Sequence, residues 1–137
     1  GPPADLVLKP DGGELYVTSP ASHTLEILNT WTTENVQSLL LGLTPTRGTL
    51  TSDSRFLYVS DSAAGRVLPI EINSRLVLRP IPVGARPGVL RTTPGDDLLL
   101  VINEGSSDLA VIRVRTQSLL TLIPVGPRPN DLALKVF

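Results

Sequence analysis

Apolar residues along this chain come in short runs, separated by turns rich in proline, glycine, aspartate and serine. The runs at residues 39–43 and 98–102 have the length of single strands, and residues 24–27 alternate polar with apolar side chains. An alternation with a period of two places every second side chain on one face of a strand. Prolines and glycines recur throughout and disfavour long helices. The pattern therefore predicts many short strands.

One ten-residue stretch occurs twice in nearly the same form. IPVGARPGVL at residues 81–90 returns as IPVGPRPNDL at residues 123–132, an offset of 42 positions. The same offset relates further prolines and glycines without a gap: Pro3, Pro45, Pro87 and Pro129, and Gly42, Gly84 and Gly126. We therefore predict a single domain, 1–137, built from repeats at residues 3–44, 45–86 and 87–128 and a partial fourth repeat at 129–137.

Each repeat has room for four strands. We expect first strands at residues 5–9, 48–51 and 89–92, and at 131–136 in the partial repeat. Second strands are expected at 14–18, 56–60 and 97–102, third strands begin near residue 24 and its equivalents, and fourth strands include 78–83 and 119–125. Four antiparallel strands in about 40–45 residues is the period of a β-propeller blade. The predicted fold is all-β, with about three four-stranded blades plus the first strand of a fourth.

Two local features of the repeat carry structural expectations. The repeated glycine lies where the chain reverses from the last strand of one blade to the first strand of the next, so we expect positive φ at Gly42 and Gly84. Pro69 stands where Ile27 and Val111 stand in the other repeats. Because proline has no N–H to donate, we expect a bulge or a strand edge at that point.

Composition excludes several classes of function. Twelve basic and thirteen acidic residues are spread evenly, whereas nucleic acids and anionic membranes select clustered Lys and Arg. The chain has no Cys, which removes disulfides and thiolate metal sites. No apolar run approaches the roughly 20 residues of a membrane helix. We therefore predict no nucleic-acid partner, no membrane insertion, no metal and no cofactor.

Methionine is also absent, and the chain begins with Gly1-Pro2. These two residues are similar to the remnant that a tag-removing protease leaves behind. We therefore expect an excised segment with further sequence on either side, the alternative being a natural mature N-terminus.

The second strands carry a recognisable motif. They contain Tyr16-Val17-Thr18-Ser19 and Tyr58-Val59-Ser60-Asp61, with a Pro-Asp-Gly turn before the first and a Val-Gly-x-x-Pro closing segment after the second. This arrangement resembles the YVTN-type β-propeller repeat, found mainly in extracytoplasmic bacterial and archaeal proteins such as surface-layer proteins. The third repeat departs from it, with Leu100-Val101-Ile102-Asn103. The resemblance implies an extracytoplasmic location, whether periplasmic, cell-surface or secreted.

Candidate ligand-binding residues lie in the loops that a propeller gathers around its central channel. Arg86 and Arg128 occupy equivalent positions and are suited to an anionic ligand, or are solvated arginines beside a proline. Asp61 and Asn103 follow second strands, and Asn130 lies in the last reversal. We predict no catalytic residue, because the single histidine, His23, has no partner set around it in the sequence.

These observations favour a non-catalytic scaffold or binding module for a protein, a glycan or a cell-surface partner. One alternative is a fragment of a propeller enzyme, lactonase-like or quinoprotein-dehydrogenase-like, with its site in the channel. Another is a polypeptide made to study propeller assembly. Propellers close with about four to eight blades. We therefore expect either missing blades from a longer chain or a dimer that closes a six-bladed ring, and no stable monomer.

Overall fold

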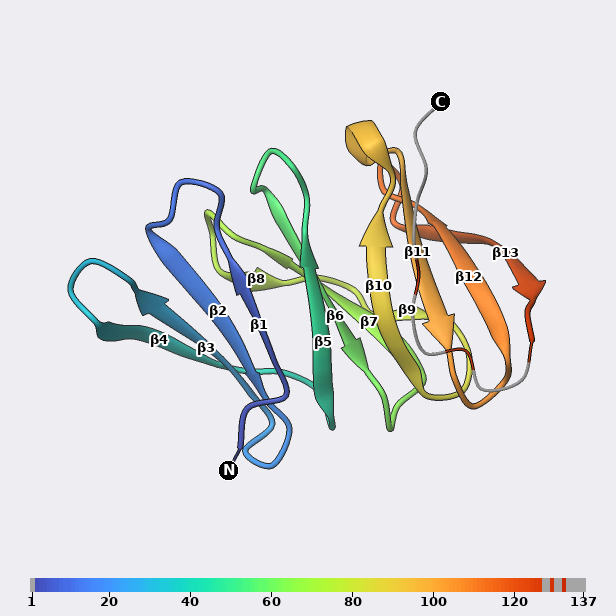
Figure 1. The fold of residues 1–137 in the computed structure, drawn as a ribbon, viewed down its shortest axis with the longest axis horizontal. Coiled ribbons are helices and arrows are strands. Elements are labelled where there is room, and N and C mark those ends of the chain that lie inside the picture. The colour runs from blue at the N-terminus through green and yellow to red at the C-terminus, as the bar shows by residue number, and fades with distance from the viewer. Residues whose placement is uncertain (1, 127–128, 130–131, 133–137) are drawn as a thin grey trace.

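The computed structural model describes residues 2–126, 129 and 132, which form three antiparallel sheets (Figure 1). The first sheet, blade 1, has the order β1-β2-β3-β4. Its strands are β1 (Asp5–Leu8), β2 (Glu14–Ser19), β3 (Thr24–Asn29) and β4 (Glu34–Leu40). Short turns join successive strands, as the Asp/Gly/Ser/Pro clusters of the sequence predict.

The third sheet, blade 3, repeats this order as β10-β11-β12-β13. It consists of β10 (Pro87–Thr92), β11 (Leu98–Asn103), β12 (Asp108–Arg113) and β13 (Ser118–Pro124), with a short 3₁₀ turn, η1 (Pro94–Asp96), after β10. The predicted architecture of four-stranded antiparallel blades is confirmed. The strand predicted at residues 131–136 lies outside the described residues.

Blade 2 differs in its outer strand. It contains β5 (Pro45–Leu50), β6 (Phe56–Asp61), β7 (Arg66–Glu71), β8 (Leu76–Val77) and β9 (Ile81–Pro82). Of the strand expected at 78–83, only residues 81–82 form a strand, β9, and the outer edge is completed by β8, which lies before the predicted range. The two short strands pair with β7 on either side of Leu68 and Pro69. Pro69 has no N–H to offer the outer strand. The register of blades 1 and 3 also shifts at the equivalent positions, next to Ile27 and Val111, so the irregularity predicted at Pro69 is present.

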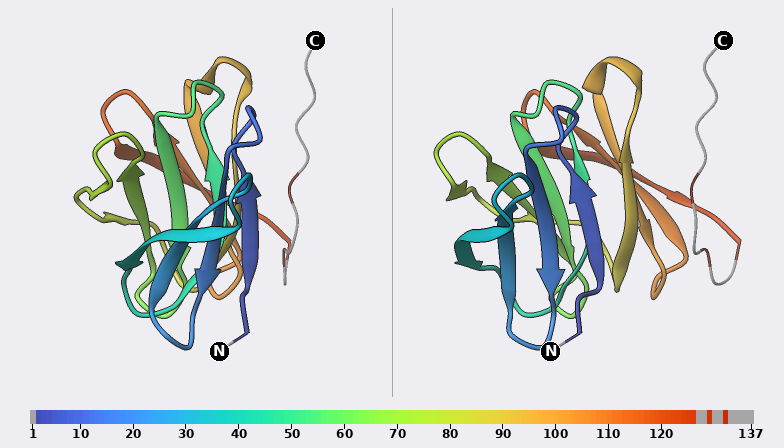
Figure 2. Two further views of the ribbon diagram at one scale, coloured as in Figure 1. Left: turned by 90° about the vertical axis from the view of Figure 1, so that its left-hand side faces the viewer. Right: turned by 60° about the vertical axis from the view of Figure 1, so that its left-hand side comes forward.

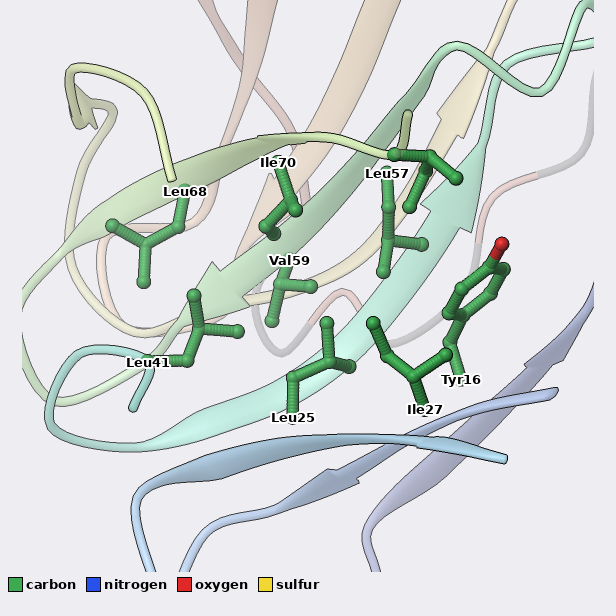
Figure 3. Close-up of a cluster of buried hydrophobic side chains, with 9 residues drawn as sticks. Tyr16, Leu25, Ile27, Leu41, Leu57, Val59, Leu68 and Ile70 are labelled. Carbon is green, nitrogen blue, oxygen red and sulfur yellow. The ribbon is translucent and has the colours of Figure 1, made fainter. Parts of the chain in front are cut away.

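The three blades stand face to face, with blade 2 in the middle and the first strands β1, β5 and β10 side by side (Figures 1 and 2). Two apolar cores fill the junctions between them. The blade 1–blade 2 core includes Tyr16, Leu25, Leu57, Val59 and Ile70 (Figure 3). The blade 2–blade 3 core is built from Tyr58, Val67, Leu99, Val101 and Ile112. The second set is the first moved along by one repeat, and each fully buried aliphatic side chain stabilises the fold by about 1.5–3 kcal/mol.

A hydroxyl hydrogen bond also joins each pair of blades. Thr18 Oγ1 donates to the carbonyl oxygen of Thr46 at 2.9 Å, and Ser60 Oγ donates to that of Gly88 at 2.6 Å. Both donors and both acceptors are equivalent in the repeat. The hydroxyl residue that follows Tyr-Val in the motif is therefore explained by the junction, and the third repeat has Ile102 at this position.

The outer face of blade 1 is apolar but carries one charge. Leu6 and Leu8 on this face are 63% and 56% exposed. Glu26 lies on the same face, in register with Val17, at the position that Leu68 and Ala110 take in the two buried cores. Its carboxylate accepts hydrogen bonds from Thr24, Asn35 and Ser38, which together lower its pKa.

Candidate functional site

The candidate residues gather at the end of the blades where the chain passes from one blade to the next. Two such passages are described: the first crossing, residues 41–45, and the second crossing, residues 83–87. Each crossing lies against the end of the second strand of the following blade, where β6 ends at Asp61 and β11 ends at Asn103.

Asp61 is fully buried, and its carboxylate is surrounded by donors. The backbone N–H of Thr44 donates to Oδ1 at 2.7 Å, and that of Leu43 lies 3.1 and 3.2 Å from the two carboxylate oxygens. Arg66 Nε donates to Oδ2 at 2.9 Å. Asp61 therefore fixes the first crossing to blade 2 through charge-assisted hydrogen bonds.

Asn103 occupies the equivalent position and is also fully buried. Its Nδ2 donates to the carbonyl oxygen of Val83 at 3.3 Å and to Asp108 Oδ1 at 2.7 Å. Its Oδ1 has no hydrogen-bond partner among the described residues. Asn103 thus holds the second crossing as Asp61 holds the first, with an amide donor in place of a carboxylate acceptor.

The repeated glycines are explained by this contact. A Cβ on Gly42 would lie 2.3 Å from Asp61 Oδ2, and one on Gly84 would lie 2.5 Å from Asn103 Nδ2. The predicted positive φ is present at Gly42, at 64°, but the prediction was wrong for Gly84. In the second crossing the left-handed residue is Arg86, with φ at 51°. Gly84 is needed because the Asn103 side chain leaves no room for a Cβ.

Arg86 is exposed, and its backbone carbonyl accepts a hydrogen bond from the N–H of Glu104 at 3.0 Å. Its guanidinium makes no ion pair within the described part of the chain. The other two candidates, Arg128 and Asn130, lie outside the described residues. Ligand binding by any of these residues remains a prediction.

The first strands of all three blades line a groove of about 460 Å³, the channel-side groove. Its polar side chains include Asp5, Arg47 and Arg91. Asp5 Oδ2 accepts a hydrogen bond from the N–H of Gly48 at 3.0 Å, which links blades 1 and 2, and Arg91 Nε donates to the carbonyl oxygen of Leu132. Arg47 is exposed.

A second hollow, the Arg47 pocket, has a volume of about 340 Å³ and lies between blades 2 and 3. Thr46, Arg47, Ser62 and Glu104 supply its polar groups. The Thr46 and Ser62 hydroxyls are 2.8 Å apart, and Ser62 Oγ donates to the carbonyl oxygen of Pro87 at 2.7 Å. Sequence reasoning did not select Arg47. The available signal was its equivalence to Asp5, two residues after a repeated proline.

The described residues contain no group of three or more histidine and carboxylate side chains arranged to hold a metal ion. Nor do they include a helix of the length and hydrophobicity needed to cross a membrane.

Comparison with known proteins identifies the fold. No protein-family model matches the chain, and no curated protein matches it. Hydrazine synthase of Kuenenia stuttgartiensis superposes with a TM-score of 0.86 at 21% identity over 92% of this chain and 37% of its own. The periplasmic gluconolactonase PpgL of Pseudomonas aeruginosa superposes with a TM-score of 0.79 at 22% identity, over 96% of this chain and 42% of its own. The WD40 repeats of RRP9 superpose with a TM-score of 0.81 at 14% identity, over 89% of this chain and 38% of their own.

These proteins share the β-propeller fold with the chain, which is therefore a set of propeller blades. The chain spans about two fifths of each, with 37%, 42% and 38% of their lengths covered. Identities of this size establish the fold alone. The finer assignment to the YVTN repeat remains a resemblance, because no family model matches.

Proposed function

We propose that these blades form part of a non-catalytic propeller that binds a glycan or a protein surface through the Arg47 pocket. The observation that carries this proposal is the composition of the pocket: two hydroxyls, a guanidinium and a carboxylate around a space of about 340 Å³. Such groups recognise polar partners by hydrogen bonds in fixed directions. Arg86 lies at the nearby second crossing, where its backbone carbonyl accepts a hydrogen bond from the N–H of Glu104.

The surroundings of the pocket support a binding role. Asp61 and Asn103 form hydrogen bonds with the two crossings, and the Ser62 hydroxyl donates to the carbonyl oxygen of Pro87. The Ser62 hydroxyl in the pocket wall and the two crossings are therefore fixed before any partner arrives. A rigid site loses less conformational entropy on binding than a mobile one.

We place the protein outside the cytoplasm. The Tyr-Val-Thr-Ser and Tyr-Val-Ser-Asp segments resemble an extracytoplasmic repeat, and the Pseudomonas aeruginosa gluconolactonase of similar fold is named as periplasmic.

We also propose that the outer faces of blades 1 and 3 are covered, by further blades or by a second copy that closes a six-bladed ring. The support lies in the repeat. The outer face of blade 1 presents Leu15, Val17 and Leu28, equivalents of Leu57, Val59 and Ile70 in the first core. Ile123 and Val125 of blade 3, equivalents of Ile81 and Val83 in the second core, are 46% and 38% exposed.

The test is a glycan-array screen followed by calorimetric titration of the glycans that bind, using the wild type, Arg47→Ala and Glu104→Gln. Arg79→Ala is the matched control, since Arg79 lies on the outer side of blade 2, between β8 and β9. We expect a loss of affinity of about tenfold or more at Arg47, the size of one charge-assisted hydrogen bond, and no change at Arg79. Equal affinities of all variants would refute the pocket. Light scattering on the same samples measures the mass, and a stable single-chain mass would refute ring closure.

The lactonase alternative has one specific observation in its favour. Asp5 and Arg47 both line the channel-side groove, and the fold neighbours include a gluconolactonase. If the chain hydrolyses gluconolactone, and Arg47→Ala abolishes that hydrolysis, the enzyme hypothesis replaces the binding hypothesis.

A further inference from the structure

A tyrosine, a carboxylate and a guanidinium form a closed set at the junction of blades 1 and 2. Tyr16 donates its hydroxyl proton to Glu14 Oε1 at 2.8 Å. Arg75, in the turn between β7 and β8, donates from Nη2 to Glu14 Oε2 at 2.5 Å and from Nη1 to Oε1 at 3.2 Å. Arg75 thereby lowers the pKa of Glu14, while burial, followed by the bond to Glu14, raises the pKa of Tyr16. Every polar group of this set has a partner.

The next junction keeps the tyrosine and loses both partners. One repeat later, Tyr58 stands for Tyr16, Phe56 for Glu14 and Gln117 for Arg75. The backbone at the turn position is the same, with φ of 60° at Arg75 and 53° at Gln117. Phe56 offers no acceptor. Tyr58 is fully buried, and its hydroxyl has no hydrogen-bond partner among the described residues.

Leaving a buried hydroxyl without a partner is unfavourable, and most buried polar groups avoid it. Burial raises the pKa of Tyr58, and the nearby Gln117 side chain partly offsets this rise. The Tyr58 hydroxyl and the Gln117 side chain nevertheless do not reach hydrogen-bonding geometry. The junction therefore presents one buried donor that the protein does not use.

A hollow of about 360 Å³, the Tyr58 cavity, lies between blades 2 and 3, and its wall includes Phe56 and Gln117, the residues that stand for the two partners of Tyr16. Gln117, Arg55 and Arg115 line it with donors, and Asp53 and Asp96 line it with carboxylates. The Tyr16 hydroxyl bonds to Glu14, which in turn bonds to Arg75, and Phe56 and Gln117 take these two places in the cavity wall. The repeat therefore puts the Tyr58 hydroxyl directly behind this part of the wall.

The acidic and basic side chains of the cavity differ in the interactions that they make with the rest of the protein. Thr51 Oγ1 donates to Asp53 at 2.6 Å, and the Ser52 N–H donates to Asp96 at 3.0 Å. Arg55 rests over the Phe56 ring at 5.2 Å. Neither Arg55 nor Arg115 forms an ion pair within the described part of the chain. The donors are thus available to a ligand, whereas the aspartates are held by the protein.

We propose that the Tyr58 cavity binds a carboxylate, supplied by a small organic acid or by an acidic side chain of a peptide. The carboxylate takes the part that Glu14 plays one junction earlier: it accepts the Tyr58 hydroxyl, the Gln117 amide and a guanidinium. A single negative charge suits the site better than two, because the carboxylates of Asp53 and Asp96 oppose the two guanidinium groups. A doubly charged phosphate would be repelled by Asp53 and Asp96.

Calorimetric titration of the full chain with sodium acetate, at constant ionic strength held with sodium chloride, tests the proposal. Acetamide is the neutral probe of the same shape. Tyr58→Phe removes only the hydroxyl, and Tyr16→Phe is its matched control, since that hydroxyl already serves Glu14. We expect acetate to bind and acetamide to bind at least tenfold more weakly. We also expect Tyr58→Phe to weaken acetate binding about tenfold and Tyr16→Phe to change it less than twofold.

The double variant Phe56→Glu, Gln117→Arg rebuilds the closed set of the first junction inside the second. It should abolish acetate binding and raise the melting temperature, and Tyr58→Phe remains decisive if the double variant fails to fold. A glutamate-containing peptide that binds more tightly than both acetate and its glutamine counterpart assigns the source to a peptide, and the reverse order assigns it to a small acid. Absence of acetate binding at tens of millimolar, equal binding of acetamide, or unchanged affinity in Tyr58→Phe overturns the proposal.

Discussion

Replacing Asp61 with alanine should remove more stability than any other single polar change at the crossings. The carboxylate is fully buried and accepts the backbone N–H groups of Leu43 and Thr44 at 3.1 and 2.7 Å. Each hydrogen bond to a charged acceptor contributes about 1.5–3 kcal/mol, so the loss of two predicts a decrease of about 3–6 kcal/mol in the free energy of unfolding. The bond from Arg66 contributes less than the two backbone bonds together, because the Arg66 side chain is 33% exposed and part of its charge stays hydrated.

Urea unfolding followed by circular dichroism measures this loss. The control is Arg66→Ala, which removes the third donor but leaves both backbone bonds intact, and we expect it to decrease stability by clearly less than Asp61→Ala does. The reasoning is refuted if Asp61→Ala unfolds within about 1 kcal/mol of the wild type, or if the two variants lose equal stability. In either case the carboxylate would not be what holds the first crossing to blade 2.

Two further predictions concern neighbouring features. Gly12→Ala, at φ 78° with open space around it, should lose about 1–2 kcal/mol from left-handed strain alone. Gly42→Ala should lose at least about 1 kcal/mol more in the same urea assay, because its Cβ also displaces Asp61; equal losses would contradict the close contact. Arg75→Gln should decrease stability at neutral pH by about 1.5–3 kcal/mol. Because the folded pKa of Glu14 lies below its ordinary value of 4.5, the contribution of the pair is complete above that pH and is lost as the pH falls through the lowered pKa. Unfolding curves of both proteins should therefore converge in acid, and a difference independent of pH would contradict the pairing.

The blades were predictable because their determinants repeat. Apolar side chains that recur at a fixed offset are buried in equivalent places. The equivalence of Tyr16 to Tyr58 and of Leu57 to Leu99 in the repeat therefore predicts two equivalent cores. An irregularity at Pro69 was predictable from its missing N–H, although blades 1 and 3 show a milder register shift at the equivalent Ile27 and Val111.

The site was less accessible to this reasoning. Asp61 and Asn103 were predicted to bind a ligand, and the structure shows both buried and hydrogen-bonded to the crossings. A side chain at the end of a strand points to solvent or to the interior according to tertiary packing, which the sequence pattern does not show. The contact that explains Gly84 is likewise tertiary. Arg47 escaped notice because its pocket forms only when two blades are side by side.

Glu26 restricts where further copies of the 42-residue repeat can be added by gene duplication. Tandem duplication adds 42 codons at a time, and most added units would fit, since each blade offers equivalent apolar faces to its neighbours. A unit inserted directly before blade 1 would instead enclose the Glu26 carboxylate, where later blades have Leu68 and Ala110. Glu26 accepts hydrogen bonds from Thr24, Asn35 and Ser38 but has no cation beside it, and enclosing such a carboxylate is unfavourable. Whatever blade covers this face must therefore bring a cation to Glu26, and a plain duplicate of the repeat placed before blade 1 is selected against unless the glutamate codon mutates first.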